Sequence, residues 1–436
     1  MKPKMLAIFL LFFAAWTAPA AADTRFIVRN PSGLTALQQL CVTLGCSVSG
    51  GLDGGLGKLF LVTTPALVDP NTFLQTLRAQ PGITNAELDS LLKVLQATAT
   101  TPPSGLSDAT PVNYFGASVW RGYVAQPAST IIRLPDTQSA FSVSGAGIVA
   151  VIVAVIDTGV DPTHPVLQGV LVPGNDFTRN TSGPGSELPD VNQCSIGPFP
   201  SPLMVNQSTA AVLDQVSGAN LSQPQYAAFG HGTMVAGIVH LIAPTAQIMP
   251  LKAFRADGSG YMSDVLRAIY FATQNGANVI NMSFSVTTYS QEMASAIKFA
   301  ARHQVICVAS AGNDGKEVSV YPAALDNVMG VASTTNNDTL SSFSNYGQDL
   351  VWVAAPGEGI ITTYPFGTYA AGWGTSFSAP MVSGAAALLL GINSNCYESG
   401  AEQSLAHAVP ISADVGNGRV DLYQAISAWR QSLNSH

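Results

Sequence analysis

The chain has 436 residues, of which 18 are lysine or arginine and 26 are aspartate or glutamate, giving a net charge of −8. Only 10% of residues are charged and 47% are hydrophobic, which excludes an intrinsically disordered protein, because disordered chains are rich in charge and poor in apolar side chains. The negative charge also argues against a nucleic-acid-binding protein, since it would repel phosphate. At about 100–200 residues per domain, the length accommodates two or three domains.

The first 22 residues have the pattern of a secretory signal peptide. Two lysines, Lys2 and Lys4, precede an unbroken apolar run at 6–16, and alanines at 20–22 stand before Asp23. The apolar run is too short for a membrane-spanning helix, which needs about 20 apolar residues. The pattern therefore predicts export, either to the outside of the cell or to a periplasm, and no membrane span after the signal is removed.

Residues 23–95 are expected to form a small α/β unit, followed by a linker at 96–128. In the unit, strands are predicted at 25–29 and 58–63, helices at 34–44 and 71–79, and a last strand or helix at 83–94. The linker begins with a run rich in Thr, Pro and Ser, a composition typical of flexible connections.

Residues 129–436 are expected to form a larger α/β domain. Apolar runs alternate with helical patterns, which predicts a mostly parallel sheet with helices on both faces. The expected strands are 147–156, 247–253, 278–282 and 305–309, and the expected helices are 231–242, 261–274, 291–302 and 376–390. The stretch at about 178–225, rich in Ser, Pro, Gly and Asn, is interpreted as a surface insertion.

One strand of this domain contains a repeat: the tetrapeptide VAVI occurs twice in tandem at 149–156. An insertion of even length preserves the alternation of side chains between the two faces of a sheet. The extra residues must therefore either loop out or extend the start of the strand.

The five cysteines are compatible with disulfide bonds in an exported protein. Cys307 lies in an apolar strand-like run and is expected to be a buried free thiol. Cys41 and Cys46 could close a small loop, which leaves Cys194 and Cys396 as the remaining candidates. No pair of CxxC motifs and no HExxH motif occurs, so a zinc site is not expected.

Three segments carry residues suited to hydrolytic chemistry. Asp157 ends an apolar run, His231 lies between two glycines before an apolar helix, and Ser376 lies near the start of another helix. Each alone has an ordinary structural role, as a turn aspartate, a loop histidine or a helix-capping serine. Together they fit catalysis, because a serine hydroxyl becomes nucleophilic when a neutral histidine accepts its proton and a carboxylate orients the imidazole.

The same segments resemble the signature sequences of the subtilisin-like serine protease family. DTG at 157–159, HGT at 231–233 and GTSFSAP at 374–380 match in the same chain order, and the agreement covers most of 129–436. The resemblance implies that Asp157 orients the imidazole, that His231 acts as general base and then general acid, and that Ser376 is the nucleophile.

The resemblance also implies an oxyanion hole and a propeptide. Asn313, in the segment AGNDG at 311–315, is expected to donate its side-chain amide to the oxyanion, with the backbone N–H of Ser376 as second donor. The unit at 23–95 is similar in pattern and position to the family's inhibitory propeptide, which assists folding and blocks the cleft. Cleavage during maturation is then expected within 95–128.

Residues that bind the substrate are assigned by the same resemblance. Ser259, Gly260 and Tyr261 resemble the family segment that pairs with the substrate backbone as an added strand. Ser283, Phe284 and Ser285 resemble the wall of the first specificity pocket. The family usually has two glycines where Ser285 and Val286 stand, and often a small pocket-floor residue where Val320 stands. Both departures predict a narrower pocket with a preference for small or medium apolar side chains.

The expected function is therefore a secreted, monomeric serine endopeptidase that acts on protein or peptide substrates and is made as a self-processed zymogen. No cofactor is expected to be required. The calcium-binding loops of the family cannot be matched residue by residue, so calcium is left unassigned and no metal ligand is predicted.

Two alternatives belong to other functional classes. An inactive binding protein on the same fold is disfavoured because no expected triad or oxyanion residue is substituted. An esterase or lipase of the α/β-hydrolase type is disfavoured because no G-x-S-x-G motif occurs and because the chain order in that fold is serine, acid, histidine.

The signal peptide can be tested on exported protein. We expect the mature chain to start at or after Asp23, because the small residues before it suit signal-peptide cleavage. Mass spectrometry of the exported protein reports this terminus directly. Exported protein that retains Met1 would contradict the prediction.

Overall fold

The computed structural model describes residues 23–65, 68–93, 103–145, 150–191, 224–394 and 396–434. The predicted signal peptide at 1–22 lies outside these residues. The strands are β1 (Thr24–Arg29), β2 (Ser47–Gly51), β3 (Leu59–Thr64), β4 (Asn85–Leu88), β5 (Leu91–Lys93), β6 (Pro111–Tyr114), β7 (Ala117–Trp120), β8 (Ile152–Asp157), β9 (Gly174–Asp176), β10 (Thr181–Gly183), β11 (Gln247–Lys252), β12 (Ser259–Tyr261), β13 (Val279–Met282), β14 (Ile306–Ser310), β15 (Met329–Thr334), β16 (Val353–Pro356), β17 (Ile360–Tyr364) and β18 (Thr368–Gly372). The helices are α1 (Leu34–Leu44), α2 (Pro70–Arg78), α3 (Arg121–Val124), α4 (Pro127–Ile131), α5 (Leu134–Phe141), α6 (His231–Ile242), α7 (Met262–Gln274), α8 (Gln291–Arg302), α9 (Thr375–Ile392), α10 (Glu398–Leu405) and α11 (Leu422–Asn434).

The N-terminal unit, residues 23–93, is built on an antiparallel sheet with the order β2-β3-β1-β4. Helices α1 and α2 pack on this sheet, and their side chains Leu37 and Leu77 share a core with Phe26 and Val28 of β1. The predicted strands and helices of this unit are confirmed. Strand β2 was not expected, because its small, polar and mostly exposed residues lack a strand-like apolar alternation.

The main body, residues 103–434, is built on an eight-stranded sheet with the order β10-β9-β11-β8-β13-β14-β15-β16. Every neighbouring pair is parallel except β10 with β9. The predicted fold class, a mostly parallel sheet between helices, is confirmed. Strand β8 lies between β11 and β13 and ends at Asp157, so this carboxylate stands at the edge of the sheet where ligands bind in such folds.

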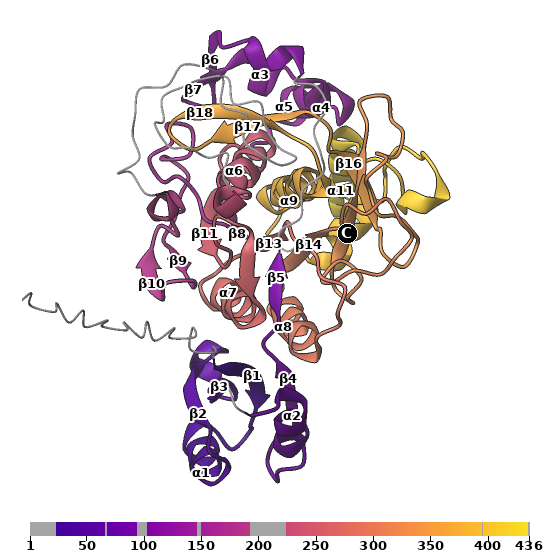
Figure 1. Ribbon diagram of the computed structural model, residues 1–436. Helices are drawn as coiled ribbons and strands as arrows, with labels where there is room; N and C mark the ends of the chain where they lie inside the picture. The colour runs from indigo at the N-terminus through magenta and orange to yellow at the C-terminus, as the bar shows by residue number, and fades with distance from the viewer. Residues whose placement is uncertain are drawn as a thin grey trace, which may run out of the picture.

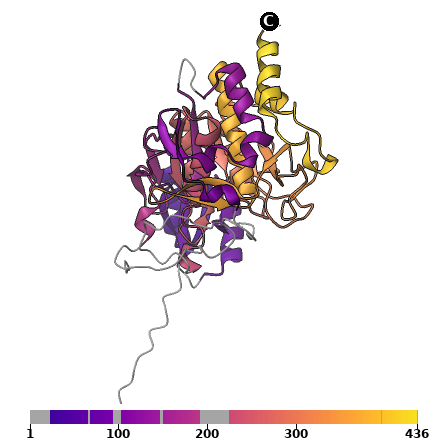
Figure 2. The same cartoon turned by 90° about the horizontal axis from the view of Figure 1, so that it is seen from above.

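Helices α6 and α9 cover one face of the large sheet, and α7 and α8 cover the other (Figure 1). Strand β8 serves both faces, because Val153 and Val155 join the core with α6 and α9 whereas Ala154 and Ile156 join the core with α7 and α8. Helix α11 packs beside α5 and α9 at the edge of the molecule where the chain ends (Figure 2).

Helix α9 runs through the centre of the main body. Among the residues that the structure describes, it is the one helix long and apolar enough to cross a membrane, and 89% of it is buried inside the protein. Gly384 allows α9 to approach α6 closely, because a Cβ at this position would lie 2.6 Å from the Cβ of Ile242. The apolar character of α9 thus belongs to a core helix.

Residues 103–128 do not form the expected linker, because they are folded onto the main body. Val119 and Tyr123 are buried, and the Tyr123 hydroxyl donates to the carbonyl oxygen of Gly237 on α6 over 2.7 Å. The side chain of Gln126 both donates to and accepts from the backbone of Ile361, over 2.8 and 2.9 Å. The linker-like composition applies only to the beginning of the stretch, and apolar residues follow it.

The predicted surface insertion at 178–225 needs a similar correction. Residues 178–191 belong to the main body, with β10 paired to the large sheet and Glu187 fully buried; the residues from 192 to 223 lie outside the described part of the chain. The second copy of the VAVI repeat forms β8, and most of the first copy precedes this strand.

The cysteines follow the expectations where the structure describes them. Cys41 and Cys46 form a disulfide at the end of α1. Cys307 is a buried free thiol on β14, and burial raises its pKa. Cys396 is a second buried free thiol in this structure, so its pairing with Cys194, which lies outside the described residues, is not observed.

The anchoring of 103–128 can be tested by truncating Tyr123. We expect Tyr123→Ala to lower the free energy of unfolding by about 3–5 kcal/mol, because it removes a buried aromatic ring and the hydrogen bond to Gly237. Ser118→Ala, an exposed position on β7, serves as a control with an expected change within about 0.5 kcal/mol. Equal urea midpoints for the two variants would mean that the segment contributes no stability.

Candidate active site

Asp157 and His231 meet at the end of β8. The carboxylate belongs to the last residue of the strand, and the imidazole belongs to the first residue of α6. His231 Nδ1 lies 2.7 Å from Asp157 Oδ1, and each residue is only 1% exposed. The backbone N–H of Thr158 donates to the same carboxylate oxygen over 2.7 Å. The structure therefore brings together two of the three residues of the expected triad.

A glycine makes this approach sterically feasible. Gly232 lies in the first turn of α6, directly over the loop that follows β8. A Cβ at this position would lie 2.0 Å from the carbonyl oxygen of Gly159, so any larger residue would push the helix away from the loop. The glycine after His231 thus contributes to the short distance between the imidazole and Asp157.

Ser376 lies in the first turn of α9, where the helix dipole favours negative charge. Its hydroxyl donates to the carbonyl oxygen of Ser283 over 3.1 Å, rather than to His231. The other ring nitrogen of His231, Nε2, is buried and has no hydrogen-bond partner among the described residues. The His231 ring packs against Phe377, the residue after the serine, with 5.5 Å between ring centroids. The expected hydrogen bond between serine and histidine is therefore not formed in this structure.

Asn313 lies beside the serine, on the loop after β14. Its side-chain oxygen accepts hydrogen bonds from the backbone N–H and the hydroxyl of Thr375, over 2.9 and 3.0 Å. Because the amide group is planar, these bonds turn its NH₂ group away from Thr375. This geometry suits the predicted oxyanion donor, whose residue must be fixed before the reaction.

The segment expected to bind the substrate backbone is already paired with another part of the chain. Strand β12 forms an antiparallel pair with β5, the last described strand of the N-terminal unit, in a register that places Gly260 opposite Leu92 and Tyr261 opposite Leu91. In Figure 1, β5 rises from the N-terminal unit into the main body between α7 and α8. The edge of β12 therefore accepts an added strand, as predicted for the substrate.

The three predicted residues of the specificity pocket have different surroundings. Ser285 lines a cavity of about 680 Å³ together with Val286, Val320 and Leu91. Phe284 instead packs in the core, and Ser283 bonds to Ser376. Of the three residues, only Ser285 lines this cavity, and the assignment of all three to the wall of a specificity pocket stays a prediction.

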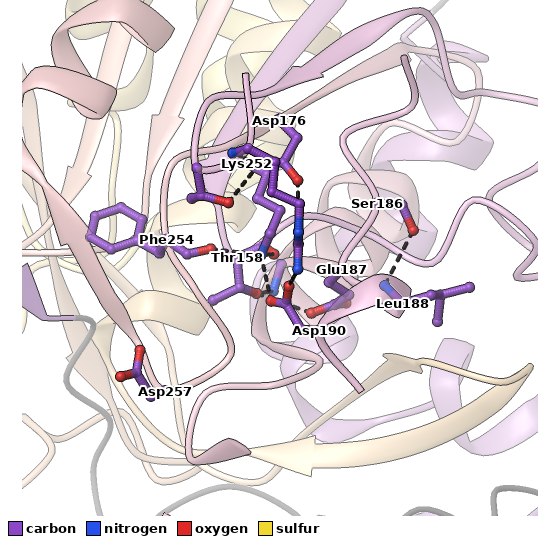
Figure 3. A network of polar contacts seen from close by, with 12 residues as sticks. Thr158, Asp176, Ser186, Glu187, Leu188, Asp190, Lys252, Phe254 and Asp257 are labelled. Atoms are coloured by element: carbon purple, nitrogen blue, oxygen red, sulfur yellow. Dashed lines mark hydrogen bonds and ion pairs between the residues drawn. The ribbon is translucent and has the colours of Figure 1, made fainter. Parts of the chain in front are cut away.

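A buried polar network behind the Asp157–His231 pair was missed by the sequence analysis (Figure 3). Two of its charged members, Glu187 and Lys252, are fully buried. The Lys252 ammonium group donates to the carbonyl oxygens of Thr158 and Phe254 and to the carboxylate of Asp190. Lys252, which ends an apolar strand, could have indicated a buried charge that needs polar partners. The polar sequence around Glu187, in contrast, suggested only a surface loop.

The described residues contain no group of three or more His, Cys, Asp or Glu side chains arranged to hold a metal ion. The polar groups gathered at the site are a carboxylate, an imidazole, a hydroxyl and an amide. This set suits acid–base and nucleophilic chemistry.

Comparisons with known proteins agree with the geometry. Residues 149–423 match the model of the subtilase family. The chain belongs to the subtilase family. The matched range contains Asp157, His231, Asn313 and Ser376, and the predicted enzyme class, a subtilisin-like serine endopeptidase, is confirmed.

Two curated relatives are each 33% identical to this chain. Thermitase from Thermoactinomyces vulgaris aligns over 297 residues, which are 68% of this chain and 93% of thermitase. A thermophilic serine proteinase from Bacillus sp. (strain AK1) aligns over 279 residues, which are 63% of this chain and 61% of that protein. The chain thus spans less than two thirds of this second relative.

A solved structure extends the likeness in fold to nearly the whole chain. Fervidolysin from Fervidobacterium pennivorans, a keratinolytic enzyme related to subtilisin, superposes with a TM-score of 0.70 at 22% identity. The superposition covers 93% of this chain and 61% of fervidolysin. The likeness in fold therefore extends beyond the main body into the N-terminal unit.

The role of Asn313 can be tested by removing its amide. We expect Asn313→Ala to lower kcat by about 10²–10³ with little change in KM, because loss of a preorganised donor weakens binding of the transition state; this range was measured on the oxyanion-hole asparagine of subtilisin. Asn275→Ala, which removes an exposed amide at the end of α7, is the matched control. Steady-state kinetics on a peptide anilide measure both variants. A wild-type kcat in Asn313→Ala would argue against Asn313 as an oxyanion donor.

Proposed function

We propose that the chain is a secreted serine endopeptidase, made as a zymogen that processes itself and hydrolysing peptide bonds through an acyl-enzyme. The observation that carries the proposal is the buried hydrogen bond of 2.7 Å between Asp157 and His231, with Ser376 in the first turn of the neighbouring helix. The Asp157–His231 bond orients the imidazole as a triad base requires, and Nε2 is left without a partner in the described part of the chain and so can accept the serine proton.

In the acylation step, His231 Nε2 accepts the Ser376 proton while Oγ attacks the carbonyl carbon of the scissile bond. This step requires the hydroxyl to exchange its bond to the Ser283 carbonyl for one to His231, a rotation about one side-chain bond. Asp157 stabilises the imidazolium that forms. The negative charge on the substrate oxygen is stabilised by the amide of Asn313 and the backbone N–H of Ser376, at the positive end of α9.

Collapse of the tetrahedral intermediate expels the amine, which takes the proton from His231. A water molecule then attacks the acyl-enzyme while His231 accepts its proton. His231 returns this proton to Ser376 Oγ as the ester bond breaks, which releases the carboxylic acid product and regenerates the Ser376 hydroxyl. Nucleophile, base and oxyanion donors all come from the chain itself, so we propose that no cofactor is required for these steps.

We propose further that the N-terminal unit inhibits the enzyme before maturation. The pairing of β5 with β12 supports this, because it occupies the strand edge assigned to the substrate. The backbone N–H of Met262 continues the contact by donating to the Ser90 carbonyl oxygen over 2.9 Å. Leu92 is buried against the main body, in a core shared with Met262, as a bound substrate side chain would be.

Polar contacts hold the rest of the unit against the main body. Arg29 on β1 forms an ion pair with the buried Glu292 of α8, with hydrogen bonds of 3.0 and 3.1 Å from its Nε. At the start of α7, Asp89 accepts from the backbone N–H and the hydroxyl of Ser263, each over 2.8 Å. The unit is therefore seated on the ends of the two helices that flank the proposed substrate edge.

Secretion and the substrate class follow from separate observations. The basic start, the apolar run at 6–16 and the alanines at 20–22 support export. We propose that the mature enzyme is a monomer that acts on protein or peptide chains able to add a strand to β12, with small or medium apolar side chains beside the cavity lined by Ser285 and Val320.

Two assays test this function against its alternatives. A serine-directed fluorophosphonate probe should label the mature protein at Ser376, because only an activated serine reacts. Digestion of casein should then distinguish a protease from an esterase. Absence of labelling would favour a binding protein, whereas labelling with ester cleavage but no casein cleavage would favour an esterase.

Self-processing can be tested with Ser376→Ala. We expect this variant to accumulate as an exported proform that retains the N-terminal unit, because the cut that separates the unit needs the nucleophile. Mass spectrometry of wild-type and variant proteins compares their N-termini. Normal processing of the variant in the same host would mean that another protease performs the cut.

A further inference from the structure

Glu187 has an unusual environment for a carboxylate. It is fully buried, although it lies in a stretch whose composition is typical of a surface loop. It also stands next to both elements that supply the Asp157–His231 pair. The peptidase mechanism above assigns it no role.

Three groups donate hydrogen bonds to Glu187. Oε2 accepts from the Thr158 hydroxyl over 3.1 Å and from the backbone N–H of Gly230 over 2.8 Å. Oε1 accepts from the Thr233 hydroxyl. These partners immediately follow Asp157 in the chain, immediately precede His231, and lie in the first turn of α6.

The direction of these hydrogen bonds is fixed by a second set of contacts. The Thr158 hydroxyl accepts from the backbone N–H of Gly232 over 3.0 Å, and the Thr233 hydroxyl accepts from the backbone N–H of Asp161 over 2.8 Å. Each hydroxyl therefore directs its own proton at Glu187. The pattern is matched to an ionised carboxylate, which can accept at both oxygens but cannot donate.

Lys252 supplies the opposite charge from β11. Its ammonium group donates to the Thr158 carbonyl oxygen over 2.6 Å and to Asp190 over 2.7 Å, and its positive charge also favours the ionised form of Glu187. Figure 3 shows the side chains of Glu187, Asp190 and Lys252 converging on Thr158. The loop after Asp157 is thus held by both charges.

We propose that Glu187 is a positioning residue of the hydrolytic reaction: its carboxylate ties the loop after Asp157 to the first turn of α6 and so fixes the imidazole of His231 against Asp157. This inference rests on the proposed function. Glu187 contacts Thr158, Gly230 and Thr233 rather than the nucleophile, so it acts only through the geometry of the Asp157–His231 pair.

We call Glu187 and its three donors, Thr158, Gly230 and Thr233, the clamp. Its strength depends on pH, because Glu187 can take up a proton, whereas a purely steric support would not depend on pH. Burial raises the pKa of Glu187 to about 8, against the opposing effects of its hydrogen-bond donors and of Lys252. Below this pH the carboxyl group is protonated, and the oxygen that carries the proton is a poorer acceptor of hydrogen bonds. Above this pH the carboxylate accepts hydrogen bonds from all three donors. The clamp is therefore expected to tighten as the pH rises through about 8.

Other titratable groups face this region from each packed element. They are Asp157 on β8, Asp161 on the following loop, Lys252 on β11, His231 on α6, Tyr364 on β17 and, through Lys252, Asp190. Burial and the charge of Glu187 raise the pKa of Tyr364, so this hydroxyl stays protonated in the range where Glu187 titrates.

The test compares the mature wild-type enzyme with Glu187→Gln. Glutamine has the same size, but in either orientation of its side-chain amide the NH₂ group lies against a hydrogen-bond donor. At least one hydrogen bond to residue 187 is therefore lost. We expect kcat at pH 9 to fall by about tenfold, and KM for a peptide anilide to change by less than about twofold. The wild-type rate should show a rise near pH 8 that is absent from the variant.

Controls separate positioning from stability. Rates are normalised to the sites that react with a fluorophosphonate, so that misfolded protein is not counted. Glu398→Gln is the matched control, because this half-buried glutamate on α10 also has a raised pKa, of about 7, but lies outside the network. If Glu187→Gln does not fold, Thr233→Val removes one of the three donors to Glu187, together with the acceptor of the Asp161 N–H, and should lower kcat by about threefold.

The proposal is overturned if Glu187→Gln keeps the wild-type kcat and pH profile, even with a lower melting temperature. Failure of the proposed function is a separate outcome, in which the wild-type chain neither cleaves peptides nor reacts with the probe. The clamp is then judged by NMR on the Nδ1 proton of His231. A signal that broadens in Glu187→Gln but not in Glu398→Gln supports it, and an unchanged signal refutes it.

Discussion

The hydrogen bond between His231 and Asp157 is the contact on which the rest of the site depends. It joins the end of a central strand to the start of a helix from a distant part of the sequence, within a region that excludes water. Burial strengthens the electrostatic interaction between the two groups, but it also requires that the surrounding backbone be fixed. The glycine at 232, the donors around Glu187 and the packing of α6 on α9 all contribute to that fixation.

Much of this arrangement could be predicted from the sequence because it depends on local patterns. The apolar strands and the helices at 231–242 and 291–302 have clear periodicity, and Asp157, His231 and Ser376 lie where strand ends and helix starts meet. Their proximity follows from the rule that the ends of parallel strands share one edge of a sheet. Asn313 could be found only by family resemblance, since an asparagine in a glycine-rich turn has ordinary explanations.

The features that escaped prediction depend on tertiary contacts. The polar sequence around Glu187 suggested a surface loop, yet this carboxylate is buried because distant donors and a lysine surround it. Residues 103–128 were included in a linker that was predicted from the composition of its first residues, and their anchoring depends on partners more than 100 residues away, such as Gly237 for Tyr123. The rotamer of Ser376, bonded to Ser283, likewise could not be read from local sequence.

The disulfide of the N-terminal unit has a consequence for the time course of activation. Both of its cysteines belong to that unit, so this bond does not tether the unit to the main body. The proposed maturation cut, expected within 95–128, would leave the unit and the main body as two molecules in equal amounts, held together only by reversible association. Because the released unit would rebind at high concentration, freshly cleaved enzyme would then stay inhibited there. It would become active on dilution, or once it had digested the released N-terminal unit.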